Sequence, residues 1–491
     1  MPVTDLPPAV DERHARYASP LGARYASPAM LALWSSQERH ALWRRLWLAL
    51  AESQQALGVA IPDEALAEMR AHLDDIDFGA VAAYEARFRH DVMAHVHAFA
   101  DCAPAARRFI HLGATSCYVT DNGDLILMRR GLELLRRKAV GVLASLAEFA
   151  RRWRAEPTLG YTHLQPAQLV TVGKRAALWM QDLVLDVEDV DRRMAMLPFR
   201  GVKGTTGTQA SFLAMFDGDH EKVRALDRMV TAKMGFSTSI PVSGQTYSRK
   251  IDAQVLGAVS GLAASAAKFA SDLRMLQAFG ELEEPFGTEQ IGSSAMAYKR
   301  NPMRSERINA LARFVLSLEP NANATHSVQY FERTLDDSAN RRLAIPEAFL
   351  ATDAILVLYG NVAAGLEVHP ARIRRRVDDE LPFMATEEIL VRAVRAGGDR
   401  QAVHEVIRRH SVEASRALKD GLSERNDMLA RLARDPEFGV LGLSLDDMRA
   451  AVDPRRFVGR APEQVDEFLA EVVAPLLTGR EHDGSVDEVR V

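Results

Sequence analysis

The sequence has very little cysteine and no excess of positive charge. Its 491 residues include only two cysteines, Cys102 and Cys117, which excludes a disulfide framework and a zinc site built on paired cysteines. The formal net charge is −5, from 61 basic and 66 acidic side chains, so no overall positive field attracts nucleic acid or an anionic membrane. We therefore expect neither a nucleic-acid partner nor a membrane partner.

Long apolar segments are scarce as well. Residues 1–17 lack the apolar core of a signal peptide, and no run approaches the roughly 20 apolar residues of a membrane helix. The content of 47% hydrophobic and 26% charged residues is typical of a soluble globular protein. Because two reduced thiols also suit the cytoplasm, we expect a soluble cytoplasmic protein.

What the sequence does have is helical periodicity over unusual lengths. Between residues 121 and 155 apolar side chains recur at an alternating spacing of three and four, which indicates a long helix in a bundle. Pro157 ends this helix, because proline cannot continue it. The same pattern predicts four further long helices, over residues 166–197, 249–279, 302–318 and 336–365. The predicted fold class is all-α, with a central bundle of very long helices.

Three helical domains are predicted around this bundle: residues 1–115, 116–368 and 369–491. A helix of 30 residues extends about 45 Å, farther than one small core can cover. Its apolar face needs partners, and neighbouring copies of the chain can supply them. The bundle therefore predicts a symmetric homo-oligomer.

Four polar loops between the helices are candidates for chemistry, because functional residues often lie on loops held by a rigid scaffold. In the first, Arg89, His90 and Asp91 precede a second segment that contains Thr115 and Ser116. These side chains can hold an anionic substrate, but histidines near helix ends are often structural. The sequence alone leaves the two interpretations even.

The second loop, residues 160–166, contains His163, which the predicted helices place next to a helix N-terminus. Such a position would disfavour the imidazolium ion, although a capping or packing role is the alternative. The third loop, residues 200–209, contains Lys203 and several hydroxyls but no phosphate-binding motif, so its signal for anion contact is weak. The fourth, residues 292–302, is called the signature loop below. Its Asn301 and the following proline are predicted to cap the next helix.

The signature loop carries a resemblance. The segment GSSAMAYKRNP matches the Gly-Ser-Ser-x-Met-x-x-Lys-x-Asn-Pro motif of the fumarase/aspartase superfamily. Further segments resemble the adenylosuccinate lyase family, and most of all its branch that includes animal enzymes. They are RYASP at 24–28, RHDVMAH, FIHLGATSCYVTDN, YTHLQPAQLVTVGKRA, FRGVKGTTGTQASF, SGQTYSRK and FERTLDDSANRR. The resemblance covers nearly the whole chain.

The resemblance implies a fold, an assembly and a reaction. Members of this family are all-α homotetramers whose active sites are shared between subunits. They cleave adenylosuccinate to AMP and fumarate by β-elimination. They also cleave the succinylated aminoimidazole carboxamide ribotide to its carboxamide ribotide and fumarate, in purine nucleotide biosynthesis. Neither a metal nor an organic cofactor is implied.

The resemblance also assigns roles to residues. His163 corresponds to the general acid that protonates the leaving nitrogen, and Ser293 to the general base. Lys299 corresponds to the group that stabilises the carboxylate as the carbanion forms, and Glu306 to the group that orients a histidine. The substrate-binding positions are Arg24, Tyr25, Arg89, His90, Asp91, Thr115, Ser116, Gln245, Arg307, Arg333, Ser338 and Arg342.

Two features of the sequence depart from the family pattern. Ala297 replaces the proline that usually follows the signature methionine, which we expect to favour an open loop. A second RYASP occurs at residues 16–20, and we assign the substrate contact to residues 24–28 from their spacing to the first long helix.

Two alternative functions are weighed against this one. Another lyase of the superfamily, such as argininosuccinate lyase, would need no phosphate contacts from Arg24, Ser338 and Arg342. A non-catalytic helical scaffold would have lost its catalytic side chains first, yet His163, Ser293 and Lys299 are all present.

Overall fold

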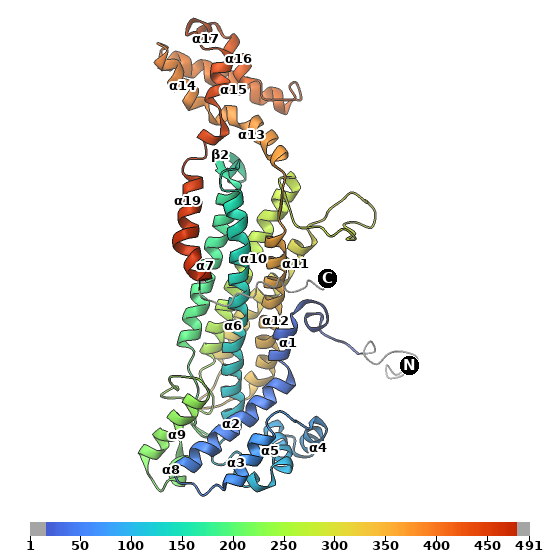
Figure 1. The fold of residues 1–491 in the computed structure, drawn as a ribbon, viewed down its shortest axis with the longest axis vertical. Coiled ribbons are helices and arrows are strands. Elements are labelled where there is room, and N and C mark those ends of the chain that lie inside the picture. Colours follow the sequence, from blue (N-terminus) through green and yellow to red (C-terminus); the bar gives the residue numbers. More distant parts are fainter. Residues whose placement is uncertain (1–15, 479–491) are drawn as a thin grey trace.

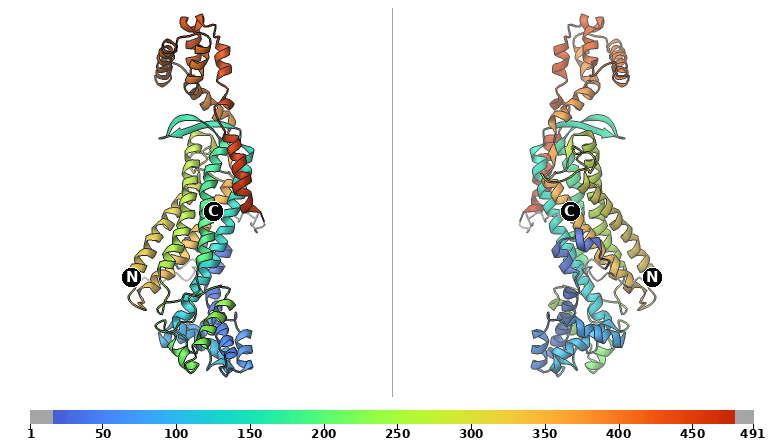
Figure 2. Two further views of the ribbon diagram at one scale, coloured as in Figure 1. Left: turned by 90° about the vertical axis from the view of Figure 1, so that its left-hand side faces the viewer. Right: turned by 90° about the vertical axis from the view of Figure 1, so that its right-hand side faces the viewer.

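The structure is a computed structural model, and it describes residues 16–478. Within those residues, five long helices run side by side through the middle of an elongated molecule (Figure 1). They are α6 (Ser116–Arg152), α7 (Val172–Met196), α10 (Lys250–Phe279), α11 (Met303–Ser327) and α12 (Asp336–Ala364). Smaller groups of helices lie at both ends of this bundle (Figure 2). The predicted bundle of very long helices is confirmed, whereas the signal-peptide prediction rests largely on residues 1–15, outside the described part.

The bundle core follows from the periodicity of the sequence. On α6 the side chains of Leu125, Leu132 and Leu146 are fully buried, as the alternating spacing predicts. Gly131 lies on the same helix, and a Cβ there would stand 2.7 Å from the ring of Phe349 on α12. Glycine is therefore required at this crossing, because a larger residue would force the two helices apart.

Two of the long helices, α10 and α12, are long and apolar enough to span a membrane by length and composition alone. The prediction that no segment approaches the length and apolar composition of a membrane helix was therefore wrong for these two helices. However, 61% of the α10 window and 72% of the α12 window are buried inside the protein. Both are therefore core helices of a soluble protein.

One end of the bundle, the head end, holds the N-terminal part of the chain and one later segment. The elements here are α2 (Ser36–Ala56), α3 (Asp63–Ala71), α4 (Phe78–Phe88), α5 (Asp91–Cys102), η2 (Pro104–Ala106), α8 (Ala210–Met215) and α9 (His220–Lys233). The preceding η1 (Leu21–Tyr25) and α1 (Pro28–Leu33) lie partway along the bundle, against α12 (Figure 1). Ser27 caps α1, since its hydroxyl accepts a hydrogen bond from the Met30 amide at 3.4 Å.

The other end carries a separate lobe (Figure 1). The chain leaves the bundle through α13 (Pro370–Met384). The C-terminal lobe comprises α14 (Thr386–Arg395), α15 (Arg400–Lys419), α16 (Met428–Arg434), α17 (Pro436–Val440) and α18 (Leu445–Ala451). After η3 (Pro454–Arg456), the elements α19 (Ala461–Phe468), η4 (Leu469–Val473) and α20 (Ala474–Leu477) return to the bundle, where α19 packs along α7. The lobe has its own hydrophobic cluster. The predicted domain boundaries at residues 115 and 368 stay predictions.

Two pairs of short strands interrupt the helices. Strands β1 (Pro157–Thr162) and β2 (Gln165–Thr171) form an antiparallel hairpin, and β3 (Leu282–Glu283) pairs with β4 (Glu367–Val368). The prediction of a helix from residue 166 was therefore wrong. The N-cap of α7 is Thr171, whose hydroxyl accepts from the Lys174 amide at 3.0 Å, and the preceding Val170 and Thr171 are β-branched residues that favour a strand.

The helix α11 also differs from its predicted extent. Predicted to end at residue 318, it continues to Ser327 with Pro320 inside it. Proline removes one helical hydrogen bond, but α11 packs against both α10 and α12, and beyond Pro320 the hydroxyl of Thr325 still bonds to Asn340 on α12 at 3.3 Å. Tertiary packing therefore outweighs the local break.

Candidate active site

The candidate residues occupy three places along the bundle. One group lies at the head end, a second lies on and after the signature loop, and His163 lies at the tip of the β1–β2 hairpin. The hairpin and the signature loop are near the end from which α13 departs (Figure 1). The helix α11, with 25 residues, begins just after the signature loop and runs toward the head end over about 37 Å. The groups are thus separated within one chain.

At the head end, side chains from three helices come together. His90 caps α5 by accepting a hydrogen bond from the Met93 amide at Nδ1, at 3.3 Å. Its Nε2 lies 3.4 Å from the hydroxyl of Ser116, the first residue of α6. Arg342 on α12 forms an ion pair with Asp91 in the first turn of α5. Burial favours a higher pKa for Asp91, but the hydrogen bond from Arg342 outweighs it and holds the pKa below its usual value.

Two further head-end candidates, Thr115 and Ser338, lie at the N-terminal ends of α6 and α12, and a third, Arg89, ends α4. Thr115 is the N-cap residue of α6, and its side chain makes no capping bond. A helix N-terminus favours an anion through its free amides and its dipole. On α12, Ser338 and Arg342 are four residues apart and therefore share one face. Arg89, the C-cap of α4, adopts a left-handed backbone conformation with φ 55°.

The segments around Gln245 and Arg333 are joined by hydrogen bonds. The Gln245 amide donates to the carbonyl of Glu332 at 2.9 Å, and its side chain donates to the carbonyl of Thr205 at 3.0 Å. The guanidinium of Arg333 lies 3.0 Å from the carboxylate of Asp337. The structure therefore brings these candidates to the start of α12, close to the group around His90.

A buried ionic network supports this end of the bundle, and the sequence analysis missed it. Arg249 donates to Asp121 at 3.1 Å and to Asp337 at 2.7 Å, and all three side chains are at most 2% exposed. Arg341 pairs in the same way with Asp252 at 2.7 Å. Burial alone would raise the pKa of Asp121, but the charge of Arg249 outweighs it and keeps the pKa low.

Two polar residues of the candidate loops, His111 and Lys203, have structural roles. His111 accepts a hydrogen bond at Nδ1 from the indole of Trp47 at 2.9 Å, and burial lowers its pKa to about 4. Lys203 is 5% exposed, and its ammonium group lies 2.8 Å from the carboxylate of Asp227. The hypothesis that Lys203 contacts an anionic ligand is therefore not supported, because Asp227 already neutralises it.

The signature loop folds back on itself. A Cβ at Gly292 would stand 2.1 Å from the carbonyl oxygen of Lys299, so only glycine fits there. The hydroxyl of Ser293 accepts hydrogen bonds from the amides of Ala295 at 3.3 Å and Met296 at 3.1 Å. Two backbone donors aimed at one oxygen stabilise negative charge on it. Lys299 is exposed and close in the chain to this oxygen.

The predicted cap of α11 was wrong. The side chain of Asn301 donates to the carbonyl of Gly292 at 2.7 Å and thereby closes the signature loop. The cap is Glu284, whose carboxylate accepts from the amides of Arg304 at 3.0 Å and Ser305 at 2.9 Å. A sequence search for an N-cap considers adjacent residues, whereas this carboxylate comes from before the loop.

The first turns of α11 carry two more candidates. Glu306 is exposed, and its carboxylate lies 3.9 Å from the guanidinium of Arg274. Arg307 stands over the ring of Tyr25, with its guanidinium carbon 5.6 Å from the ring centroid. Arg24 is the exposed neighbour of Tyr25 in η1. The first RYASP copy differs, because its Tyr17 is 91% exposed, and this favours the assignment to residues 24–28.

His163 lies at an exposed tip. His163 and Leu164 form the two-residue turn between β1 and β2, with φ of 53° and 58°. Two successive left-handed residues are typical of the tight hairpin turn that suits twisted strands. The helix α7 begins only at Val172, so the predicted influence of a helix N-terminus on His163 was wrong.

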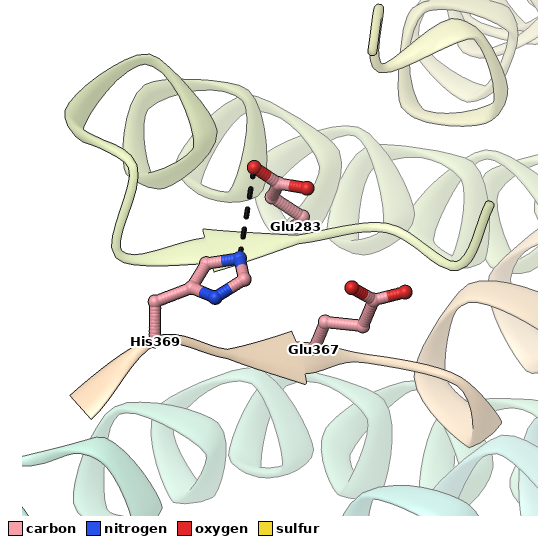
Figure 3. A group of neighbouring side chains, drawn as sticks. All are labelled: Glu283, Glu367 and His369. Atoms are coloured by element: carbon pink, nitrogen blue, oxygen red, sulfur yellow. Dashed lines mark ion pairs between the residues drawn. The ribbon is translucent and has the colours of Figure 1, made fainter. Parts of the chain in front are cut away.

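Among residues 16–478, a cluster of potential metal ligands lies at the β3–β4 pair, in contact with Arg300 at the end of the signature loop. Glu283, Glu367 and His369 offer ligand atoms within 4.8 Å of one another (Figure 3). The guanidinium of Arg300, however, lies 3.1 Å from Glu283 and 3.0 Å from Glu367. A cationic side chain of the protein itself therefore already bridges the two carboxylates.

Comparisons with known proteins agree over almost the full length. Residues 42–316 match a family model described as lyase, and residues 382–468 match one described as adenylosuccinate lyase C-terminus. The chain is 51% identical to adenylosuccinate lyase of Saccharomyces cerevisiae, over 93% of this chain and 95% of that protein. It is 47% identical to adenylosuccinate lyase of Schistosoma mansoni, over 94% of this chain and 96% of that protein.

A solved structure shares the fold at low identity. The 3-carboxy-cis,cis-muconate lactonizing enzyme from Pseudomonas putida superimposes with a TM-score of 0.79 and 24% identity, covering 92% of this chain and 98% of that one. This likeness confirms the predicted fold and is too distant to indicate a substrate.

Proposed function

The chain belongs to the adenylosuccinate lyase family, and we propose that it cleaves adenylosuccinate to AMP and fumarate. We extend the proposal to the second reaction of the family, in which the succinylated aminoimidazole carboxamide ribotide yields its carboxamide ribotide and fumarate. The observation that carries the proposal is the 51% identity to a named adenylosuccinate lyase over 93% of the chain. Both reactions break a C–N bond by β-elimination and belong to purine nucleotide biosynthesis.

In this proposal Ser293 is the general base. It removes a proton from the carbon beside a carboxylate of the succinyl group. A serine hydroxyl is a weak base, so its alkoxide needs local stabilisation. The amides of Ala295 and Met296, which donate to the Ser293 oxygen, support this role. The exposed ammonium group of Lys299 then stabilises the carboxylate on which negative charge accumulates.

His163 is the proposed general acid. It donates a proton to the nitrogen as the C–N bond breaks, so the amine leaves as a neutral group. Its exposed position at a hairpin tip is suited to delivering the imidazole into a site formed elsewhere. Glu306, which is exposed at the start of α11, is proposed to orient a histidine of that site.

The head-end group is proposed to bind the nucleotide and the succinyl carboxylates. Ser338 and Arg342, on one face of α12, are proposed to hold phosphate, because a guanidinium matches phosphate oxygens in two-point contacts. Arg24 and Tyr25, which lie near Arg307 at the start of α11, are proposed to contact the nucleotide as well. The remaining proposed contacts to the substrate are Arg89, His90, Asp91, Thr115, Ser116, Gln245, Arg307 and Arg333.

The active site is proposed to form between subunits of a homotetramer. Within one chain the signature loop and the head-end group are separated by roughly the length of α11, about 37 Å, which exceeds the size of a nucleotide. Large apolar side chains are exposed along the bundle, including Leu185 at 56% on α7 and Leu343 at 66% on α12. Such faces are normally covered by another chain. We place the enzyme in the cytoplasm.

Two assays test the proposal. Purified protein mixed with adenylosuccinate should release fumarate and AMP, followed by the change in ultraviolet absorbance. Turnover of argininosuccinate instead would keep the mechanism and overturn the substrate. For the shared site, a Ser293→Ala protein, changed in the signature loop, and an Arg342→Ala protein, changed at the head end, are mixed and allowed to exchange subunits. Activity should return in the mixture, because some sites then receive both intact residues. A mixture that stays inactive after exchange is complete would overturn the shared site.

A further inference from the structure

Arg300 joins the end of the signature loop to the β3–β4 pair of strands. Its guanidinium lies 3.1 Å from the carboxylate of Glu283 on β3 and 3.0 Å from that of Glu367 on β4. The same guanidinium stands 5.2 Å from the ring centroid of Phe286, between β3 and the loop. Two side chains from the strands and one from the segment between β3 and the signature loop therefore surround one arginine.

The two carboxylates need a cation between them. Glu283 and Glu367 are directly opposite each other in the antiparallel pair (Figure 3). Like charges in such positions repel and destabilise the pairing of the strands. A guanidinium that bridges both removes this repulsion, so closure of the loop end and pairing of β3 with β4 favour each other.

The main chain of Arg300 is fixed as well. Its carbonyl accepts a hydrogen bond from the side chain of Gln277 on α10 at 2.9 Å. On one side its neighbour Asn301 closes the loop onto Gly292. On the other side its neighbour is Lys299, whose side chain is exposed. Holding Arg300 therefore fixes the main chain from which the side chain of Lys299 projects.

The ion pairs of Arg300 position the loop end more than they stabilise the fold. Arg300 is 44% exposed, Glu283 21% and Glu367 40%, and ion pairs at such exposure add little to the free energy of folding. Resting on the proposed function, we propose that Arg300 is a positioning residue, which holds Lys299 and Ser293 in place through Glu283 and Glu367. Because β4 leads directly into α13, the same contact couples the signature loop to the chain segment that enters the C-terminal lobe.

The test compares Arg300→Gln, Glu367→Gln and the double variant in the adenylosuccinate assay. Each single variant should lower kcat by about 10–100-fold while KM changes much less, because small misplacements of reacting groups have effects of this size. The double variant should be no worse than Arg300→Gln alone, since both changes break one contact. Arg300→Lys keeps a positive charge between the carboxylates and should recover part of kcat.

A matched control removes an equivalent charge elsewhere. Arg408→Gln breaks an exposed ion pair with Glu405 on α15 and should leave kcat unchanged. Losses that multiply in the Arg300 and Glu367 double variant would overturn the proposal, because Arg300 would then act independently of Glu367. An unchanged kcat in Arg300→Gln would overturn it equally.

Hydrogen exchange supplies a readout that does not depend on turnover. Amides of the signature loop should exchange faster in Arg300→Gln and in Glu367→Gln than in the parent protein, and should not change in Arg408→Gln. Equal exchange in all four proteins would overturn the positioning role. A parent protein without activity on adenylosuccinate would refute the proposed function, while the exchange data would still decide whether Arg300 holds the loop. If Arg300→Gln does not fold, Glu367→Gln provides the same test.

Discussion

The two ends of the bundle are built in opposite ways. At the head end, the candidate binding residues lie next to the buried network of Arg249, Asp121 and Asp337. These three side chains are at most 2% exposed, and Arg249 donates hydrogen bonds to both carboxylates. At the other end, the candidate catalytic residues Lys299 and His163 lie exposed on a loop and a hairpin tip. The candidate residues at the head end are held by buried side chains, whereas those of the signature loop are held by a few contacts where the loop meets α10, β3 and α11.

This difference separates two requirements of an enzyme. Recognition of a phosphate or carboxylate needs donors whose positions do not change, and a buried ionic network provides them. A general acid and a general base must meet the substrate only after it has bound, and loops that close afterwards can do so while excluding water. Changes at the head end should therefore alter stability and binding, and changes at the loop end should alter turnover.

The largest effect is expected at the loop end. Ser293→Ala removes the proposed general base, so kcat should fall by about 10²–10⁴-fold, the usual contribution of such a group. The melting temperature should stay the same, because the hydroxyl contacts only amides of its own loop. Ser294→Ala is the matched control and should lose far less activity. A Ser293→Ala protein with a lower melting temperature than the parent protein would contradict the proposal that the loop end affects turnover and not stability.

The next effect is expected in the head-end network. Asp337→Asn removes the charge that holds Arg249 at 2.7 Å and Arg333 at 3.0 Å. Breaking a buried ion pair from one side costs about 3–5 kcal/mol. The midpoint of urea unfolding and the melting temperature should fall, and KM should rise because Arg333 loses its support. Glu405→Gln, which breaks an exposed pair, should change stability by less than about 1 kcal/mol.

Acid should destabilise the head end through its histidines. Burial lowers the pKa of His40 to about 3, and that of His95 and His111 to about 4. Unfolded histidine titrates near pH 6.5, so below that pH the unfolded chain binds protons that the folded chain does not. Stability should therefore be complete above about pH 6.5 and fall toward pH 4, by about 1 kcal/mol per pH unit and group.

A single substitution tests this pH dependence. His111→Asn keeps an acceptor for the indole of Trp47 and tolerates the left-handed backbone at φ 68°, but does not titrate. Its melting temperature should fall less than that of the parent protein between pH 7 and pH 5. Parallel curves for the two proteins would show that His111 is not a source of the acid sensitivity.

The smallest effect is expected for Ala297→Pro. Ala297 occupies the second position of a turn closed by the hydrogen bond from the Lys299 amide to the Met296 carbonyl at 3.0 Å, where proline is favoured. Proline should lower the conformational entropy of the open loop and thereby stabilise the ordered loop by about 0.4–1 kcal/mol. Slower hydrogen exchange in the signature loop and a modest change in kcat are the expected results. If both are unchanged, Ala297 does not set the balance between open and closed loops.

The long helices could be predicted because their apolar stripes repeat over many turns. The hairpin could not, because Pro166 resembles the first residue of a helix, while the residue that caps α7 is Thr171. The buried network was also hidden, since Asp121 and Asp337 on a helix look like residues of a solvated face until their partners are known.

The candidate site was predictable as a set of residues and not as an arrangement. Motifs in separate segments identified His163, Ser293 and Lys299, but no spacing along the chain reveals that one chain keeps their segments apart from the head-end group. The cap of α11 shows the same limit on a smaller scale. Glu284 and Ser305 meet across the whole signature loop, which no local pattern encodes.

The C-terminal lobe is a cassette, by which we mean an insertion whose two ends both connect to the bundle, through α13 and α19. Ile373 on α13 and Val465 on α19 both belong to the hydrophobic core of the bundle, whereas the helices between them have a core of their own. The lobe is therefore tied to the bundle by two chain segments, which restrict its orientation more than a single terminal linker would. Exchange of the whole cassette with that of a relative would leave the route of the polypeptide through the bundle unbroken.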